Sequence, residues 1–272
     1  MKVLVNLALT LVAGVSLSAQ DPLDIVRRSV ERDWTDFESR KDYLYHQHRE
    51  FREYSKDGSV SNRRSETKEL LVVGGRPFER LIARNDQPLA EREARREQQT
   101  FDREVAAWQR QSAADRLKLE KERAEDRKFI RELPDAFVFR LLGVENVSGQ
   151  PAWVIEAEPN QGYRPAHARA RMFTKVRAKV WIEQATYHWV KMDAEALDTL
   201  TFGFGLLRVA PGGTLHFEQV KVNDEIWLPS RALIHADARL ALIKKLHAEI
   251  DIRYSDYRKF RSDSQVIEAR EN

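Results

Sequence analysis

Apolar and polar residues alternate with a period of two along much of the second half of the chain. Between Val176 and Ile182 every second residue is apolar, and the alternation resumes over residues 187–196 after a short polar turn. Two such runs joined by a short turn are typical of an antiparallel β-hairpin. We therefore predict a hairpin over this part of the chain.

Both faces of this predicted hairpin carry something large and apolar. Trp181 falls among charged residues in the first run, and Trp189 does so in the second. Strict alternation places Val190 and Met192 together on the face opposite Trp189. A sheet with one dry face and one wet face would not place tryptophans among its charges, so each face is expected to contact something apolar.

Runs of the same texture recur along the chain, separated by residues that favour turns. Residues 43–85 contain three such runs, broken at Asp57-Gly58 and at Gly74-Gly75. Strand texture returns from residue 134 onward, and Asn223-Asp224 joins one late strand to the next. Together these runs predict about nine to eleven strands with hairpin-length connections. Short sequential connections predict one large antiparallel sheet, and a sheet of this size twists and tends to curl.

Two segments have helical character instead. Residues 21–39 predict a short amphipathic helix with an Asp21-Pro22 start. Residues 88–132 are rich in Ala, Glu, Arg, Gln and Lys, and their apolar stripe is limited to residues such as Phe101, Val105 and Trp108. Sustained heptads are absent, which argues against a coiled coil. We expect one or two solvated helices that lean on the sheet by one edge, with a partner-binding arm as the alternative.

The fold class predicted from these patterns is α+β, mainly antiparallel β. It consists of a large curved sheet, an incomplete β-barrel, with short helices and one long charged helical insertion at about 88–132.

The first nineteen residues have the pattern of a secretory signal peptide. A short positive start is followed by an apolar run, and small residues near Ser18 or Ala19 offer a cleavage site. An uncleaved N-terminal anchor is the alternative. We therefore expect a signal peptide at 1–19, export to the periplasm, and a single domain over 20–272. About 250 residues are enough for one substantial core.

The composition and the motifs exclude several classes of functional site. The chain has no cysteine, which excludes disulfides, cysteine-ligated zinc, a thiol nucleophile and a lipidated cysteine. Its formal net charge is +3 with 33% charged residues, so the two signs nearly cancel and no nucleic-acid partner is expected. His46 and His48 share a strand face, but one such pair without nearby carboxylates is a weak metal signal. Phosphate-binding and nucleophile-elbow motifs are absent, so we expect no catalytic residue, no metal, no cofactor and no enzyme activity.

Aromatic residues on strands exceed what one dry face needs. The economical interpretation is a curved sheet whose concave face holds something apolar that the protein does not itself supply. The alternative is that each tryptophan packs under a loop or helix and donates its ring N–H to a carbonyl. The candidate ligand-contacting residues are Trp153, Trp181, Trp189, Met192, Phe202, Phe204, Phe217 and Trp227. The glycine-punctuated stretch 200–213 is expected to be a lid, a membrane-touching loop, or a loop buried at the opening of the concavity.

Two stretches carry a resemblance to a known family. They read "KVWIEQATYHWVKMDAE" and "GGTLHFEQVKVNDEIWLPSRALI". In this order, after a signal peptide and a short helix, they resemble the outer-membrane lipoprotein-sorting (LolA/LolB-like) superfamily and its uncharacterised periplasmic members. The resemblance covers about 134–260, with weaker support from 23–85. It implies an incomplete barrel around an apolar cavity with helices as a lid, and a cavity that takes acyl chains of lipoproteins or other lipids. The 88–132 insertion departs from the sorting carriers.

These observations leave three hypotheses for function. The first is a periplasmic, non-catalytic carrier that binds lipid or lipoprotein acyl chains and contacts a membrane transiently. The second is an envelope scaffold or stress sensor that binds a protein partner through the charged helix at 88–132. The third is a hydrolase whose catalytic groups meet only in space.

Overall fold

The computed structural model describes residues 20–37, 39–74, 76–202, 207–240, 244–260 and 266–268, and the segment predicted as a signal peptide lies outside them. The helices are α1 Pro22–Asp36, η1 Ser39–Asp42, α2 Glu91–Gln109, α3 Ala113–Arg127, η2 Lys128–Glu132, α4 Leu133–Ala136 and η3 Arg169–Lys175, where η marks a 3₁₀ helix. The first strands are β1 Tyr43–Tyr54, β2 Val60–Val73, β3 Arg76–Arg84, β4 Gln87–Pro88, β5 Phe137–Val147, β6 Gln150–Pro159 and β7 Val176–Glu183. The remainder are β8 Trp189–Ala196, β9 Leu200–Phe202, β10 Leu207–Val209, β11 Thr214–Val222, β12 Ile226–Leu240, β13 Lys244–Phe260 and β14 Val266–Glu268.

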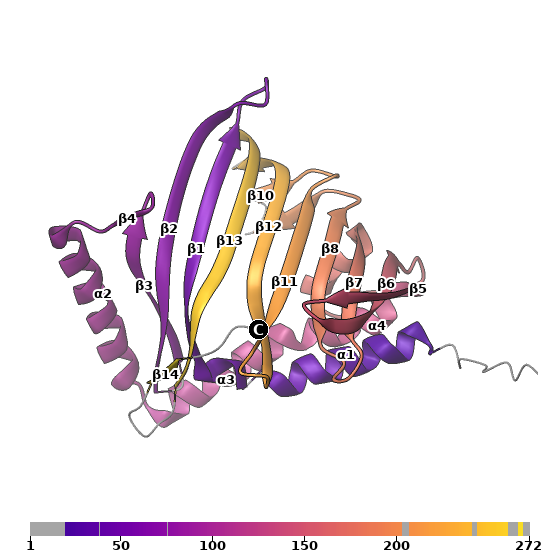
Figure 1. Ribbon diagram of the computed structural model, residues 1–272, viewed down its shortest axis with the longest axis horizontal. Helices are drawn as coiled ribbons and strands as arrows, with labels where there is room; N and C mark the ends of the chain where they lie inside the picture. The colour runs from indigo at the N-terminus through magenta and orange to yellow at the C-terminus, as the bar shows by residue number, and fades with distance from the viewer. Residues whose placement is uncertain are drawn as a thin grey trace, which may run out of the picture.

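All fourteen strands of the described chain belong to one antiparallel sheet (Figure 1). Its main path runs β4-β3-β2-β1-β13-β12-β11-β8-β7-β6-β5. The first strand pairs with the long late strand β13, so the N-terminal meander and the C-terminal hairpins join in mid-sheet. The predicted α+β class with one large curved antiparallel sheet is confirmed.

Helix α1 begins as the sequence predicts. The Asp21 carboxylate accepts a hydrogen bond from the Leu23 amide at 3.0 Å, and Pro22 occupies the first turn, where its missing N–H costs nothing. Ile25 and Val26 on its apolar face are buried against Trp153, Ile155 and the neighbouring strands. The helix thereby covers one end of the sheet's inner face.

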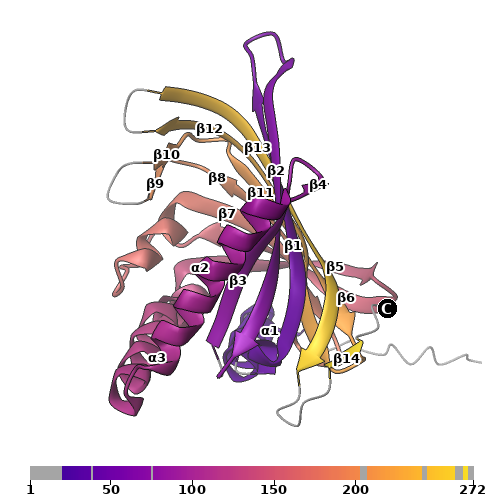
Figure 2. The same cartoon turned by 90° about the vertical axis from the view of Figure 1, so that its left-hand side faces the viewer.

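The inner face is the concave side, on which α1, η2, α4 and η3 lie (Figure 2). The outer face opposite it is partly covered by the far end of the β5–β6 hairpin, which crosses the sheet in Figure 1. Under that hairpin Trp181 packs with Val154, Val190 and Trp227 in a separate apolar cluster. Two apolar clusters on opposite faces explain why the β7–β8 hairpin carries large apolar side chains on both sides.

The 88–132 insertion forms α2, α3 and η2. Helix α2 packs along β3 through one narrow stripe, in which Phe101 contacts Phe78 edge-on and Trp108 is only 5% exposed. The Trp108 ring lies between the guanidinium groups of Arg76 and Arg116, at 5.0 and 5.4 Å. Helix α3 buries none of its side chains. The insertion is therefore a pair of solvated helices, the first leaning on the sheet by one edge.

Glu132 ties the short helices below the sheet to the loop before η3. Its carboxylate accepts hydrogen bonds from the Tyr163 hydroxyl, from the His167 ring, and from the amides of Ala166 and His167 at 2.9 Å. Burial alone would raise the pKa of Glu132, but these donors outweigh it and lower the pKa to about 2. The ionised carboxylate therefore stabilises this junction.

We expect the substitution Glu132→Gln to lower the free energy of unfolding by about 2–3 kcal/mol at pH 7. The folded-state pKa lies below the ordinary value of 4.5, so the stabilisation is complete above about pH 4.5 and is lost as the pH falls towards 2. Urea unfolding of both proteins between pH 7 and pH 2 measures this. Glu122→Gln, on the exposed surface of α3, is the control and should change little. A deficit that stays constant down to pH 2 would contradict the assignment.

Candidate ligand-binding cavity

A cavity of about 740 Å³ occupies the inner face of the sheet. Its floor is helical: Val26, Val30, Phe129, Leu133 and Phe173 come from α1, η2, α4 and η3. Its wall comes from the sheet. The apolar wall residues are Phe51, Phe137, Phe139, Ala157, Val176, Ala178, Val180, Ile182, Trp189, Met192, Ala194, Ala196, Leu200, Phe202, Leu207, Val209, Leu215, Ile234, Ala236, Ala238, Leu246, Ala248 and Ile250. Glu195, Gly213, Thr214 and His235 also line the wall.

The cavity stays open because alanines occupy much of the wall. Ala178, Ala194, Ala236 and Ala248 lie at inward positions where neighbouring strands face each other, as in the pairs Ala178↔Ala194 and Ala236↔Ala248. Larger side chains at these positions would meet the helices and fill the space, as cores normally do. An apolar cavity without polar partners for water favours an apolar ligand.

A β-bulge decides which face the hairpin tryptophans occupy. Trp181 pairs with Lys191, whereas the next residue, Ile182, pairs with Trp189. Val190 is the extra residue, and it joins Trp181 in the outer cluster. Strict alternation grouped Val190 with Met192; that grouping is wrong, because the bulge turns Trp189 and Met192 both towards the cavity.

Three of the other predicted ligand-contacting residues lie in or near the cavity. Phe202 lines the cavity, at 42% exposure. Phe217 lies behind Trp189, with ring centroids 4.9 Å apart. Trp153 is buried under α1 and beside Tyr187.

Trp181 and Trp227 do not line the cavity. Both are buried in the outer cluster, where the Trp181 ring N–H donates to Glu145 at 2.7 Å. That packing corresponds to the alternative weighed above, with a carboxylate rather than a carbonyl as acceptor. Phe204 lies outside the described residues.

Sequence reasoning missed most of the cavity. The helical floor residues Phe129, Leu133 and Phe173 belong to short helices that leave no clear period in the sequence. The small wall residues were visible in the alternation, since Ala178 and Ala194 sit at inward positions of strand-like runs. The predicted ligand-contacting residues were nearly all large aromatics and included no alanine. Alanines on a predicted inner face nevertheless indicate space for a ligand.

Asp33 on α1 is the charged residue of the cavity floor. The Asp33 carboxylate accepts hydrogen bonds from Arg40 and Arg127, both at 2.8 Å, and from the Trp189 ring N–H at 3.3 Å. Arg127 in turn lies 3.5 Å above the Phe37 ring. This cluster fastens α1, α3 and β8 together where the floor meets the wall.

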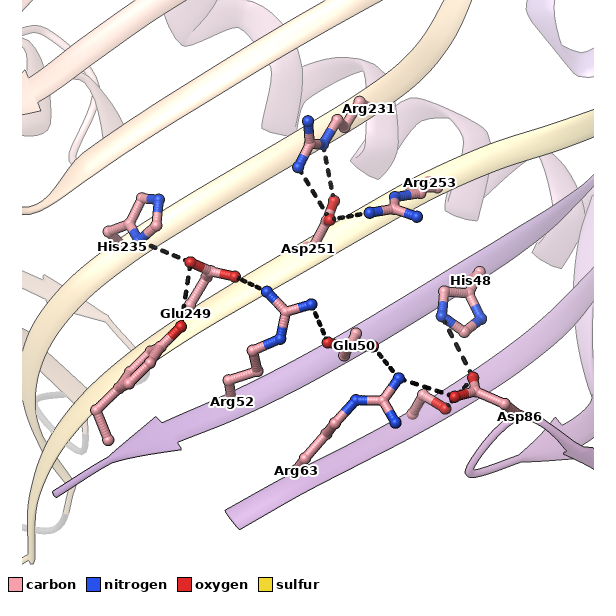
Figure 3. A network of polar contacts seen from close by, with 12 residues as sticks. His48, Glu50, Arg52, Arg63, Asp86, Arg231, His235, Glu249, Asp251 and Arg253 are labelled. Atoms are coloured by element: carbon pink, nitrogen blue, oxygen red, sulfur yellow. Dashed lines mark hydrogen bonds and ion pairs between the residues drawn. The ribbon is translucent and has the colours of Figure 1, made fainter. Parts of the chain in front are cut away.

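The outer face of β12, β13, β1 and β2 is polar instead (Figure 3). Asp251 lies between Arg231, which contacts it with two nitrogens at 3.0 Å, and Arg253 at 2.8 Å. Burial raises the pKa of Asp251, but the two guanidinium groups overcome that effect and lower it. Because Asp251 neighbours the inward-facing Ile250, one sheet layer separates the charges from the cavity.

The same network continues across β1 and β2. Glu50 pairs with Arg52 and Arg63, and Arg63 also contacts Asp86 at 2.9 Å. Hydrogen bonding from Arg63 is the main cause that lowers the pKa of Glu50. Alternating charges in mutual contact let this face meet water without an apolar cover.

The histidine pair does not converge on one point. His46 contacts Asp256 at 2.9 Å, whereas His48 contacts the Thr67 hydroxyl at 3.0 Å. In the described part of the chain, no group of three or more His, Asp or Glu side chains is placed to hold a metal ion. None of the described helices has the length and apolar character needed to cross a membrane.

Comparison with known proteins gives structural matches only. No protein-family model matches the sequence, and no curated protein matches it. A candidate outer membrane lipoprotein-sorting protein domain from Vibrio parahaemolyticus is similar, with 12% identity, 88% of this chain and 95% of that chain covered, and a TM-score of 0.37. A DUF1329 family protein from Desulfovibrio piger has 13% identity, coverages of 90% and 95%, and a TM-score of 0.34. A LolA superfamily protein from Nitrosomonas europaea has 12% identity, coverages of 89% and 94%, and a TM-score of 0.31. Two of these three proteins carry names of the lipoprotein-sorting group that the sequence resembles.

We expect Asp33→Asn to lower the free energy of unfolding by about 3–5 kcal/mol, because it leaves two largely buried guanidinium groups without their carboxylate. Denaturant unfolding measures the loss. Asp24→Asn removes a carboxylate from the same helix, but its pair with Arg28 is exposed and should contribute less than about 1 kcal/mol. Equal effects of the two substitutions would show that the cluster does not hold the floor to the wall.

Proposed function

We propose that this protein is a non-catalytic carrier that holds lipid or lipoprotein acyl chains in the cavity on the inner face of its sheet. The observation that carries the proposal is the cavity itself: about 740 Å³ lined almost wholly by aliphatic and aromatic side chains. Ligand pockets of small molecules have this size, but they usually combine apolar walls with several convergent polar groups. Here the polar lining residues are a minority, Ser29, Asp33, Glu195, Thr214 and His235, which suits a ligand that is mostly hydrocarbon.

The binding energy would come from removing methylene groups from water. Each buried methylene contributes about 0.8 kcal/mol, so affinity should rise steadily with chain length until the cavity is filled. Asp33 and Ser29 are the polar residues of the cavity floor. Asp33 already contacts two arginines, so it needs no partner from the ligand.

The site of action follows from the predicted signal peptide. If residues 1–19 direct export, the mature chain would work in the periplasm, where lipids and lipoproteins must cross an aqueous space between membranes. The chain contains no cysteine that could be acylated. No cofactor is required for this function.

The proposal predicts that filling the cavity blocks binding. The double substitution Ala194→Phe and Ala236→Phe places two rings in the lumen from β8 and β12, which β11 separates. If these rings displace two or more methylenes of a long-chain fatty acid, affinity should fall about tenfold or more. Binding is followed by the fluorescence of a polyene fatty acid, titrated into protein that has first been stripped of lipid.

The matched control is Val144→Phe on β5, which adds the same ring at a position 56% exposed and outside the cavity. It should bind the fatty acid as the unmodified chain does. Unchanged affinity in the folded Ala194→Phe, Ala236→Phe protein would contradict the cavity as the binding site. Weakening of the same size in the control would contradict it equally.

A protein partner is a second candidate function, and α3 is the observation that favours it. This helix buries no side chain and leaves Leu117 51% exposed. A photo-crosslinking residue at position 117 should then capture one protein of defined mass in living cells, whereas the same residue at position 144 should not. Failure to crosslink at 117 would leave the carrier as the sole proposal.

A further inference from the structure

Three cations form a row across the outer face of the sheet at one end of the cavity. Arg208 on β10 lies directly opposite Arg239 on β12, and Arg239 lies directly opposite Lys245 on β13. All three side chains are exposed. Their strand neighbours Leu207, Val209, Ala238 and Leu246 line the cavity, so the row and the cavity wall are two sides of the same strand ends.

This row has no acidic counterpart within the described residues. None of the three cations takes part in an ion pair there, in contrast to the arginines of the polar network of Figure 3. The nearest acid along the strand is Asp237, two residues before Arg239 on the same face, and it contacts His247 on β13. The field of the row is therefore uncompensated.

Folding does not account for this arrangement. Like charges directly opposite each other on neighbouring strands destabilise a sheet, and here the repulsion occurs twice in succession. Elsewhere on the outer face, arginines that lie directly opposite each other share a carboxylate. Arg231 and Arg253 both contact Asp251, and Arg52 and Arg63 both contact Glu50. The row is a local departure from that pattern, and an external anion would relieve it.

The row borders the end of the cavity that lies away from α1. The strands β9, β10, β12 and β13 extend together on the side of the molecule away from α1 (Figure 2). Phe202 on β9 lines the cavity, is 42% exposed and pairs with Leu207. Exposed apolar and cationic side chains therefore meet at one edge, which we call the cationic rim: Phe202, Arg208, Arg239 and Lys245.

We infer that the cationic rim docks on the surface of an anionic lipid bilayer, so that this end of the cavity faces the membrane. Phosphate groups would neutralise the three cations, each contributing to attraction in proportion to the anionic surface charge. Phe202 would enter the interfacial region, where aromatic rings are favoured. Lipid transfer through this edge rests on the proposed carrier function, but the docking itself requires only the rim.

An acidic protein is the competing partner for a basic row. The rim has the apolar Phe202 beside its charges and the apolar cavity lining on the other side of the same strands. An anionic bilayer offers phosphate groups to the cations and hydrocarbon to Phe202 and to the cavity. An acidic protein surface matches the charges alone. The observations therefore favour the membrane.

Vesicle co-sedimentation of the full chain tests the inference. Vesicles of phosphatidylcholine alone are compared with vesicles that also contain phosphatidylglycerol, at low and high salt. The unmodified chain should bind the anionic vesicles selectively and lose that binding as salt screens the charges. The variant R208Q/R239Q/K245Q should bind them on the order of 10- to 100-fold more weakly.

The matched control is R92Q/R96Q/R103Q, which removes the same charge from the exposed surface of α2. It should bind like the unmodified chain. Equal weakening by both triple variants would reduce the effect to net charge and overturn the rim. Absence of selective binding by the unmodified chain would also overturn it, and an acidic protein would then be the remaining candidate partner of the row.

Fatty-acid binding by the same variants separates this inference from the carrier proposal. The rim variant should keep its affinity for the polyene fatty acid, because its substitutions point away from the cavity. Lost vesicle binding with retained fatty-acid binding supports the rim. A chain that docks on vesicles but binds no fatty acid would sustain the rim and contradict the carrier.

Discussion

The structure depends on how one strongly curved sheet covers its apolar inner face. A single sheet that alternates along every strand has two faces, and burial of the inner one supplies most of the hydrophobic stabilisation. The short helices α1, η2, α4 and η3 cover one end of that face, and α1 is fastened there by Asp33 and its two arginines. Further along, alanines replace large side chains, so the covering layer and the wall do not meet. The cavity follows from this combination.

The outer face meets a different requirement, since most of it has no covering layer. Over β1, β2, β12 and β13 it carries carboxylates and guanidinium groups in contact, as around Asp251. Around Trp181 on β7 and Val190 on β8 it is apolar, and the β5–β6 hairpin covers that part. The cationic rim has neither of these arrangements, because it is exposed and its cations have no counter-charges in the described chain. The charges and apolar side chains of the first two regions find partners within the chain, whereas the cations of the rim would find theirs in a binding partner.

Much of the fold could be predicted from the sequence, because its determinants are local. Period-two runs and turn residues such as Asp57-Gly58 predicted the antiparallel sheet, and the Asp21-Pro22 start predicted α1. The residues that line the cavity were harder to predict from the sequence. Which face Trp189 occupies depends on a bulge, and a bulge is defined by the pairing between two strands. Nothing local to Trp189 shows that Val190 is the extra residue opposite Trp181-Ile182. The packing of Trp181 and Trp227 under a hairpin distant in sequence is likewise a tertiary effect.

The central claim is that the cavity holds a hydrocarbon chain in the working protein. Native mass spectrometry of the chain, gently purified from the cells that make it and followed by solvent extraction, tests this most directly. The account predicts a fraction of molecules carrying the added mass of a lipid or acylated peptide, released on extraction with acyl chains in the solvent phase. A uniform mass equal to the bare polypeptide, from a preparation that still binds no added fatty acid, would contradict it.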